Sequence, residues 1–272
     1  MRVLKANGES EEFDAEKVRR ACLRAGASDR MAEEITQSVR ARAYDGIPTH
    51  EIYAMAYKLL KQAKTGAEHR FSLKKAMMEL GPEGHAFEDF VARVFQANGY
   101  QARTRQIVKG KCVSHEVDVV AENAGEKVLV ECKFHHRPGI ECHVQNPLYV
   151  WARFQDVVEG AKSNGERPFT QAWLATNTRL SSDAVAYAEC VGLKVLGWKY
   201  PSVNGLEALI EQKRLYPVTV LTGLTSHEKD RLVGADILLL RELVQANAAG
   251  LAAKTGLPAP RIEGLKAQVH WL

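Results

Sequence analysis

The chain has 272 residues, of which 46% are hydrophobic, 26% are charged and 7% are aromatic. This composition excludes disordered, collagen-like and coiled-coil proteins, and the length predicts two or three compact domains that can each bury a core. The formal net charge of +4 at pH 7 permits a nucleic-acid partner but does not by itself indicate one.

The sequence carries no pattern typical of export or of a membrane protein. No apolar run approaches the roughly 20 residues that a bilayer span requires, and no secretory signal is recognisable. The five cysteines are odd in number and form no Cys-x-x-Cys pair, which favours reduced thiols. We therefore expect a soluble, cytoplasmic protein without a membrane partner.

The chain is predicted to open with a small hairpin. Residues 3–5 and 11–13 have the alternation of short strands, and Ala6-Asn7-Gly8 lies between them. Asn-Gly is a strong signal for a tight turn between antiparallel strands.

A helical bundle is predicted to follow and to complete a first domain over residues 1–82. Asp14, Ser28 and Thr49 are the expected N-terminal caps of three helices, each with apolar residues at three- and four-residue spacing. The glycine- and proline-rich residues 81–84 mark the end of this unit.

Residues 83–205 change to a mixed α/β pattern. A helix with an apolar face precedes two valine-rich strands at 116–120 and 127–133, which a polar loop joins as a hairpin. Further elements are predicted in the order helix 148–158, strand 172–175, helix 182–190 and strand 194–198. Strands that alternate with helices predict a mixed sheet covered on both faces.

The most informative residues lie on the predicted strand hairpin. Side chains alternate along a strand, so Glu131 and Lys133 share one face whereas Cys132 points to the other. The neighbouring strand can place Asp118 beside Glu131, and Glu88 lies on the preceding helix. Clustered carboxylates favour a hard cation such as Mg²⁺ or Mn²⁺, and a nearby ammonium suits phosphodiester hydrolysis.

Two other interpretations of this region remain open. The acids and the lysine can simply lie on a solvent-exposed surface strand without a catalytic role, because any antiparallel sheet can carry a Glu–Lys pair. Several Cys and His side chains between 112 and 143 also raise the question of zinc, although they lack the CxxC or HxxxH spacing that structural zinc sites usually have.

The order of these residues resembles the PD-(D/E)xK nuclease superfamily, and more closely its Mrr-like restriction endonuclease branch. The resemblance implies a restriction-endonuclease-like fold in which Glu88, Asp118, Glu131 and Lys133 form the active site, with Asp118 and Glu131 as ligands of Mg²⁺ or Mn²⁺. It also implies cleavage of DNA backbones that leaves a 5′-phosphate and a 3′-hydroxyl.

The N-terminal region offers a second set of candidates. Lys5 and Lys17 can converge on a polyphosphate, and Thr49 can add a hydroxyl donor, although a small packed domain with solvated lysines explains the same residues. The motif consists of Val3, Lys5, Gly8, Glu11, Phe13 and Lys17. It resembles the ATP cone, which implies ATP or dATP binding with Lys5, Glu11, Lys17 and Thr49 at the pocket; a cone that acts only as a scaffold is the alternative.

Residues 206–272 are predicted to form an all-helical tail. Glycine turns between short helices resemble helix-hairpin-helix units, which bind duplex backbones without reading sequence. The basic residues available for contacts with phosphate are Lys229, Arg231, Lys254, Arg261 and Lys266. A packing or protein-binding module is the competing interpretation.

Together these features predict a multidomain α+β protein: an ATP-cone-like domain (1–82), a nuclease domain (83–205) and a helix-hairpin-helix tail (206–272). We expect a Mg²⁺-dependent endonuclease that acts on double-stranded DNA under ATP or dATP control. A homo-oligomer is expected because duplex cleavage commonly needs two active sites.

Two further functions stay open at this point. The nuclease fold can be catalytically silent and only sense nucleotide or hold DNA. The protein can also be a nucleotide-responsive regulator like the reductase repressors, although it lacks their four-cysteine zinc ribbon.

Overall fold

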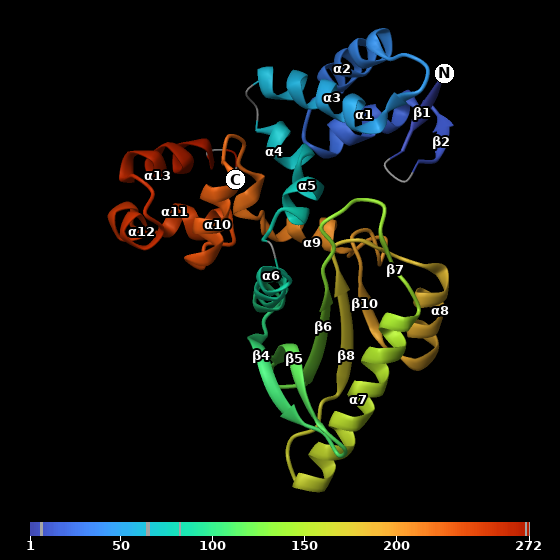
Figure 1. The fold of residues 1–272 in the computed structure, drawn as a ribbon, viewed down its shortest axis with the longest axis vertical. Coiled ribbons are helices and arrows are strands. Elements are labelled where there is room, and N and C mark those ends of the chain that lie inside the picture. Colours follow the sequence, from blue (N-terminus) through green and yellow to red (C-terminus); the bar gives the residue numbers. More distant parts are fainter. Residues whose placement is uncertain (6–7, 64–65, 82, 270, 272) are drawn as a thin grey trace.

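The structure, a computed structural model, describes residues 1–5, 8–63, 66–81, 83–269 and 271. Figure 1 shows an N-terminal bundle, a central sheet with flanking helices and a group of C-terminal helices. This arrangement confirms the predicted multidomain α+β class. None of the described helices combines the length and apolar character that crossing a bilayer demands.

The N-terminal region consists of a three-stranded sheet and helices. Its elements are β1 (Arg2–Leu4), β2 (Ser10–Glu12), α1 (Ala15–Arg24), α2 (Asp29–Arg42), β3 (Ile47–Pro48) and α3 (Thr49–Gln62). Strand β1 pairs antiparallel with β2, as the hairpin pattern predicts, and parallel with β3, which was not predicted. The predicted turn residues Ala6 and Asn7 lie outside the described residues.

Two of the three predicted caps are confirmed. The side chain of Asp14 accepts a hydrogen bond from the backbone of Glu16, and that of Ser28 accepts one from Met31. The prediction for Thr49 was wrong by one residue, because Pro48 holds the cap position and Thr49 is the first residue of α3. The side chain of Pro48 has no acceptor, so it makes no cap hydrogen bond to α3.

Two short helices that were not predicted connect the bundle to the rest of the chain: α4 (Ala67–Phe71) and α5 (Leu73–Met78). Ala67 belongs to the buried core of the bundle, whereas Leu73, Ala76 and Met77 belong to the core of the central region. The connection is therefore packed against both cores.

The central region is built around a five-stranded sheet with the order β10-β8-β6-β5-β4. Its elements are α6 (His85–Ala97), β4 (Gln101–Lys109), β5 (Ser114–Glu122), β6 (Lys127–Lys133), β7 (Glu141–Cys142), α7 (Gln145–Asn164), β8 (Gln171–Thr176), β9 (Arg179–Leu180), α8 (Ser182–Val191) and β10 (Lys194–Leu196). Strands β4, β5 and β6 are antiparallel, and β8 and β10 run parallel to β6. The connections from β6 to β8 and from β8 to β10 therefore pass through α7 and α8.

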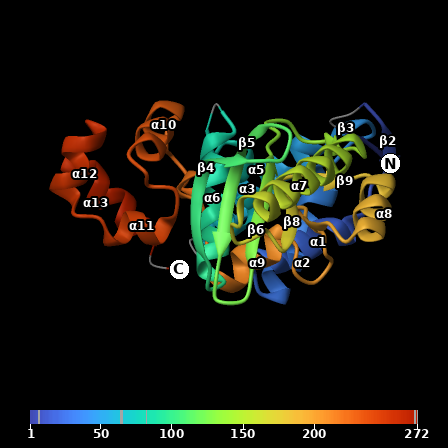
Figure 2. The same cartoon turned by 90° about the horizontal axis from the view of Figure 1, so that it is seen from below.

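Helices cover both faces of this sheet, as the alternation of strands and helices predicts. Val119 and Val130 pack with α6 and the C-terminal helices, whereas Val120 and Leu129 pack with α7 and α8. Figure 2, seen from below, shows β5 and β6 between α6 and α7. The predicted strands and helices agree with the structure to within three residues at their ends, except that α7 continues to Asn164; strands β4, β7 and β9 were not predicted.

The C-terminal region is helical, as predicted. It contains α9 (Leu206–Lys213), η1 (Val218–Val220), α10 (Ser226–Gly234), α11 (Leu240–Gln245), α12 (Ala248–Thr255), α13 (Ala259–Lys266) and η2 (Ala267–Val269), where η denotes a 3-10 helix. Leu232, Leu240 and Ile262 share one buried cluster with Phe87 and Phe90 of α6. This shared core fixes the tail against the α6 side of the sheet.

Candidate active site

The antiparallel register of β5 and β6 brings two predicted site residues together. Val119 pairs with Val130, so the next step along the two strands sets Asp118 opposite Glu131, and opposite residues share a face. Oδ2 of Asp118 accepts a hydrogen bond from the backbone N–H of Cys132 at 2.7 Å. The two carboxylates therefore lie side by side where the pairing of β5 with β6 ends.

Glu88, in the first turn of α6, lies near enough to Asp118 for the Asp118 charge to raise its pKa. Its Oε2 accepts a hydrogen bond from Nη1 of Arg105 at 3.2 Å, and Arg105 also contacts Asp89 at 3.0 Å. Arg105 has a left-handed backbone with φ of 53°. The pairing of β4 with β5 skips Arg105 and the residue opposite it, Asp118, so this local distortion directs an arginine toward the carboxylates.

Glu131 is held by an arginine from α7. Arg153 donates one hydrogen bond to the Glu131 carboxylate and another to the backbone carbonyl of Glu116. Lys133 follows Glu131 on the same face of β6 and is exposed. Within the described part of the chain Lys133 makes no recorded ion pair, so its ammonium is free to meet an incoming anion.

Sequence reasoning missed both arginines. For Arg153 a signal existed, because it falls on the apolar stripe of α7 that Val150, Phe154 and Val157 define. A charged residue on a buried helix face normally has a partner. For Arg105 no local pattern indicated a contact with α6.

Burial raises the pKa of all three carboxyl groups. The pKa of Glu131 rises to about 7, because of desolvation first and the neighbouring Asp118 charge second. The pKa of Asp118 is raised mainly by burial, and that of Glu88 by burial and then by Asp118. Carboxyl groups whose pKa is raised by burial and by neighbouring acids are typical of functional sites. A bound cation would stabilise their ionised forms.

The donor chemistry of Asp118 and Glu131 fits a hard divalent cation, which prefers carboxylate oxygens. Among the described residues, however, no three His, Cys, Asp or Glu side chains are gathered as a ready metal site. Arg153 engages Oε2 of Glu131, so a cation would bind the other carboxylate oxygen or take the place of Arg153. Water or a phosphate oxygen would supply the remaining ligands.

The cysteine and histidine side chains near this site make other contacts. Cys132 packs on the α6 face with Val128 and Val130, which agrees with its predicted orientation away from Glu131. Nε2 of His115 lies 2.8 Å from Oδ2 of Asp156.

In the N-terminal region three predicted nucleotide-binding residues lie together. Nζ of Lys5 is 3.0 Å from Oε2 of Glu11, and Nζ of Lys17 is 3.2 Å from Oε1. These two ammonium groups lower the pKa of Glu11. Thr49 begins α3, on the residue after β3.

The expectation that all five tail cations are available to DNA was wrong. Lys229 pairs with Glu79, and Arg261 donates to Glu228 at 2.6 Å. Lys266 donates to the backbone carbonyl of Ala246 at 2.6 Å. Arg261 and Lys266 therefore make contacts within the tail, Lys229 ties the tail to Glu79 after α5, and Arg231 and Lys254 are exposed.

Comparisons with known proteins cover each region. The family model described as ATP cone domain matches residues 1–78, the model described as restriction endonuclease matches 81–196, and the model described as AF1548-like, C-terminal matches 216–272. The first two matches confirm the two resemblances drawn from the sequence.

Two relatives are similar to most of this chain. An uncharacterised protein of Archaeoglobus fulgidus is 41% identical over 169 residues, which are 60% of this chain and 92% of that protein. A crystal structure titled as that of a protein of unknown function, AF1548, has a TM-score of 0.59 and 39% identity, and the match covers 68% of this chain and 96% of that chain.

Proposed function

We propose that this chain, which belongs to the same family as the Archaeoglobus fulgidus relative, is a DNA endonuclease dependent on Mg²⁺ or Mn²⁺. The chain itself matches an ATP cone domain followed by a restriction endonuclease domain. The observation that carries the proposal is the meeting of Asp118 and Glu131 across two strands, with Glu88 and Lys133 beside them.

Each residue has a chemical role in this proposal. Asp118 and Glu131 would hold the cation, which supplies a positive charge for the phosphate and lowers the pKa of water. Lys133 orients the attacking water and neutralises charge that develops on the phosphate oxygens. Glu88 holds Arg105 in place at the edge of the site.

Double-stranded DNA is the proposed substrate. The attacking water oxygen bonds to phosphorus as the bond to the 3′ oxygen breaks, which leaves a 5′-phosphate and a 3′-hydroxyl. Exposed Arg231 and Lys254 on the tail are the cations that we propose to contact the duplex backbone. Cleavage of both strands requires two such sites and hence two copies of the chain.

Control by ATP or dATP is the second part of the proposal. Lys5 and Lys17 would bind the polyphosphate in place of Glu11, and Thr49 would add a hydroxyl donor. A nucleotide can affect cleavage only if it binds two states of the protein unequally.

A chain of contacts supports such control. Lys74 of α5 donates to the backbone carbonyl of Asn177. The Asn177 side chain accepts from the backbone N–H of His135 at 2.9 Å and donates to its carbonyl at 2.8 Å. Since His135 is two residues beyond Lys133, a shift of α5 can reach the catalytic strand.

Nicking and linearisation of supercoiled plasmid test the proposal. We expect cleavage with Mg²⁺ or Mn²⁺, no cleavage with chelator, and a changed rate when ATP or dATP is saturating. Equal rates with and without nucleotide would rule out control by the cone but not the nuclease activity. Intact plasmid at every metal concentration would rule out the nuclease activity.

One observation favours a catalytically silent alternative. Arg153 occupies the Glu131 carboxylate, and a pair that never opens would leave a protein that only holds DNA or senses nucleotide. A protein that only holds DNA would retard duplex DNA in a gel at every metal concentration without cutting it, and one that only senses nucleotide would bind ATP or dATP without cutting DNA.

A further inference from the structure

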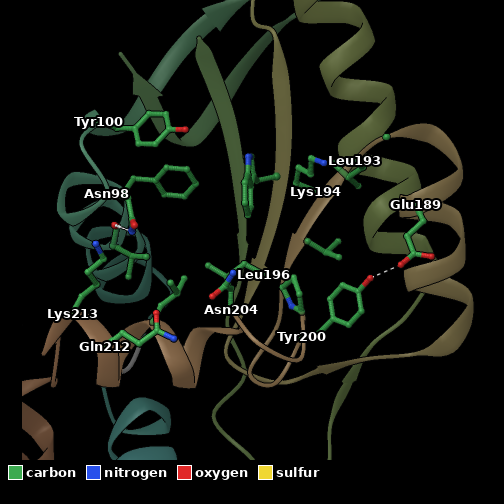
Figure 3. A pocket seen from close by; sticks show the side chains of 17 residues that line it. Asn98, Tyr100, Glu189, Leu193, Lys194, Leu196, Tyr200, Asn204, Gln212 and Lys213 are labelled. Carbon is green, nitrogen blue, oxygen red and sulfur yellow. Dashed lines mark hydrogen bonds between the residues drawn. The ribbon is translucent and has the colours of Figure 1, made fainter. Parts of the chain in front are cut away.

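A cavity of about 790 Å³ lies between the C-terminal part of α6, strands β8 and β10, and helix α9. Figure 3 shows its lining side chains, with Tyr100 and Asn98 on one side and Tyr200 on the other. The lining includes none of Glu88, Asp118, Glu131 or Lys133. The cavity is therefore separate from the candidate active site, and its volume is that of a typical small-molecule pocket.

Aromatic rings form one part of the lining. Trp173 is half-buried on β8, and its ring meets Phe95 of α6 edge-to-face with centroids 5.6 Å apart. Tyr100 meets the same Phe95 ring edge-to-face at 5.4 Å. Because these rings are fixed by one another, they offer a preformed surface on which a planar ligand can stack.

The rim is polar and positively charged. Asn98, Asn204 and Gln212 bring three exposed amide side chains to the cavity, and amides pair with the edges of nucleobases.

The rim charges fit a phosphate. Lys194 and Lys213 make no recorded ion pair within the described part of the chain, whereas the carboxylate of Glu189 already accepts a hydrogen bond from Tyr200 at 2.5 Å. Glu189 keeps its negative charge, but two ammonium groups against one carboxylate leave the lining with a net charge of +1, which suits an anionic group.

We propose that this cavity binds a nucleotide unit, with the base stacked against the aromatic rings, the base edge at the amides and the phosphate at Lys194 or Lys213. Neither the cone nor the metal-dependent site accounts for these residues. An apolar ligand would make no use of the exposed amides of Asn204 and Gln212, and a purely anionic ligand would not need the rings.

The nucleotide can come from a free molecule or from a DNA strand. Glu88 and Phe95 lie on the same helix, seven residues apart, which is roughly 10 Å along its axis. Successive nucleotides of a duplex strand advance by about 3.4 Å. A strand bound at the carboxylates can therefore extend as far as this cavity.

The experiment measures binding without metal, so that no cleavage occurs. The full chain carries Lys5→Ala and Lys17→Ala to remove binding by the cone. The probes are deoxynucleoside 5′-monophosphates, including the fluorescent 2-aminopurine nucleotide, and a six-residue single strand that contains 2-aminopurine. We expect saturable quenching, because stacking on an aromatic ring quenches this base, and weakening of about tenfold or more by Asn204→Ala with Gln212→Ala.

Asn164→Ala is the matched control, because Asn164 is an exposed amide at the far end of α7. Saturation by the monophosphate supports a free nucleotide as ligand, and saturation by the oligonucleotide alone supports a DNA strand. No saturable binding of any probe, or binding that the double amide variant leaves unchanged, would overturn the inference. Neither result bears on metal-dependent cleavage, which is measured separately.

Discussion

Arg153 on α7 and Glu131 on β6 form a hydrogen-bonded ion pair in the interior of the candidate site, with side chains that are 9% and 17% exposed. The guanidinium also donates to the carbonyl of Glu116, so it ties α7 to two neighbouring strands. A cation held by Asp118 and Glu131 would have to share the Glu131 carboxylate with Arg153 or displace it.

Arg153→Ala should lower the free energy of unfolding by about 3–5 kcal/mol, because it leaves the buried Glu131 carboxylate without its partner. Urea denaturation measures the loss. Adding Glu131→Gln should recover part of it, since the amide is neutral and needs no cation. A loss below about 1 kcal/mol for the single variant would show that the pair contributes little.

Lys133→Ala should reduce metal-dependent DNA cleavage by about 10²-fold or more, which is the usual contribution of a positioned proton-transfer or charge-stabilising group. The melting temperature should hardly change, because Lys133 is exposed at the end of β6. Lys162→Ala, at the far end of α7, is the control and should cut normally. Full activity in Lys133→Ala would place the chemistry elsewhere.

Gly160→Ala should destabilise the fold by roughly 1–3 kcal/mol. A Cβ atom at Gly160 would lie 2.5 Å from the backbone carbon of Gly110, so α7 would have to move away from the turn that follows β4. Arg153 lies on the same helix, so the displacement should also weaken its contact with Glu131.

Gly264→Ala provides the opposite outcome for comparison. Gly264 is also helical, but a Cβ there meets nothing within 4 Å, so alanine should stabilise the protein by about 0.5–1 kcal/mol. Denaturant midpoints measured for both variants check the contrast, and equal effects of the two would contradict it.

Lys74 should make stability depend on pH above neutrality. Burial lowers its pKa from 10.5 to about 7, beside Glu207, Lys199 and Arg179. Between these two values the unfolded chain binds a proton that the folded chain lacks, so stability should rise with pH by up to about 1.4 kcal/mol per unit.

Lys74→Met should remove this rise while it keeps an apolar side chain over the Trp198 ring, which Lys74 contacts at 4.4 Å. Thermal melts at pH 6.5, 8 and 9.5 compare the two proteins. Parallel curves for wild type and variant would mean that Lys74 stays protonated in the fold, held by that ring and by the Asn177 carbonyl.

The sequence by itself determined the elements and the faces of the central hairpin. The period of two along β6 separates Glu131 from Cys132, and the structure places Cys132 in the core of the α6 face while Glu131 meets α7. The sequence also identifies Asp14 and Ser28 as helix caps, because each residue type and its position just before an apolar helical pattern are local features. Strand alternation and helix capping depend on the backbone within a few residues, so a short stretch of sequence is enough to reveal them.

Only the tertiary structure decided which charges face one another. Arg153 is 22 residues from Glu131 in the chain, and Lys229 is 150 residues from its partner Glu79. Such contacts follow from the crossover through α7 and from the shared core of α6 and the tail. A local pattern can mark a buried charge such as Arg153 but cannot identify its partner, because the partner depends on how whole elements pack rather than on the conformation of any one.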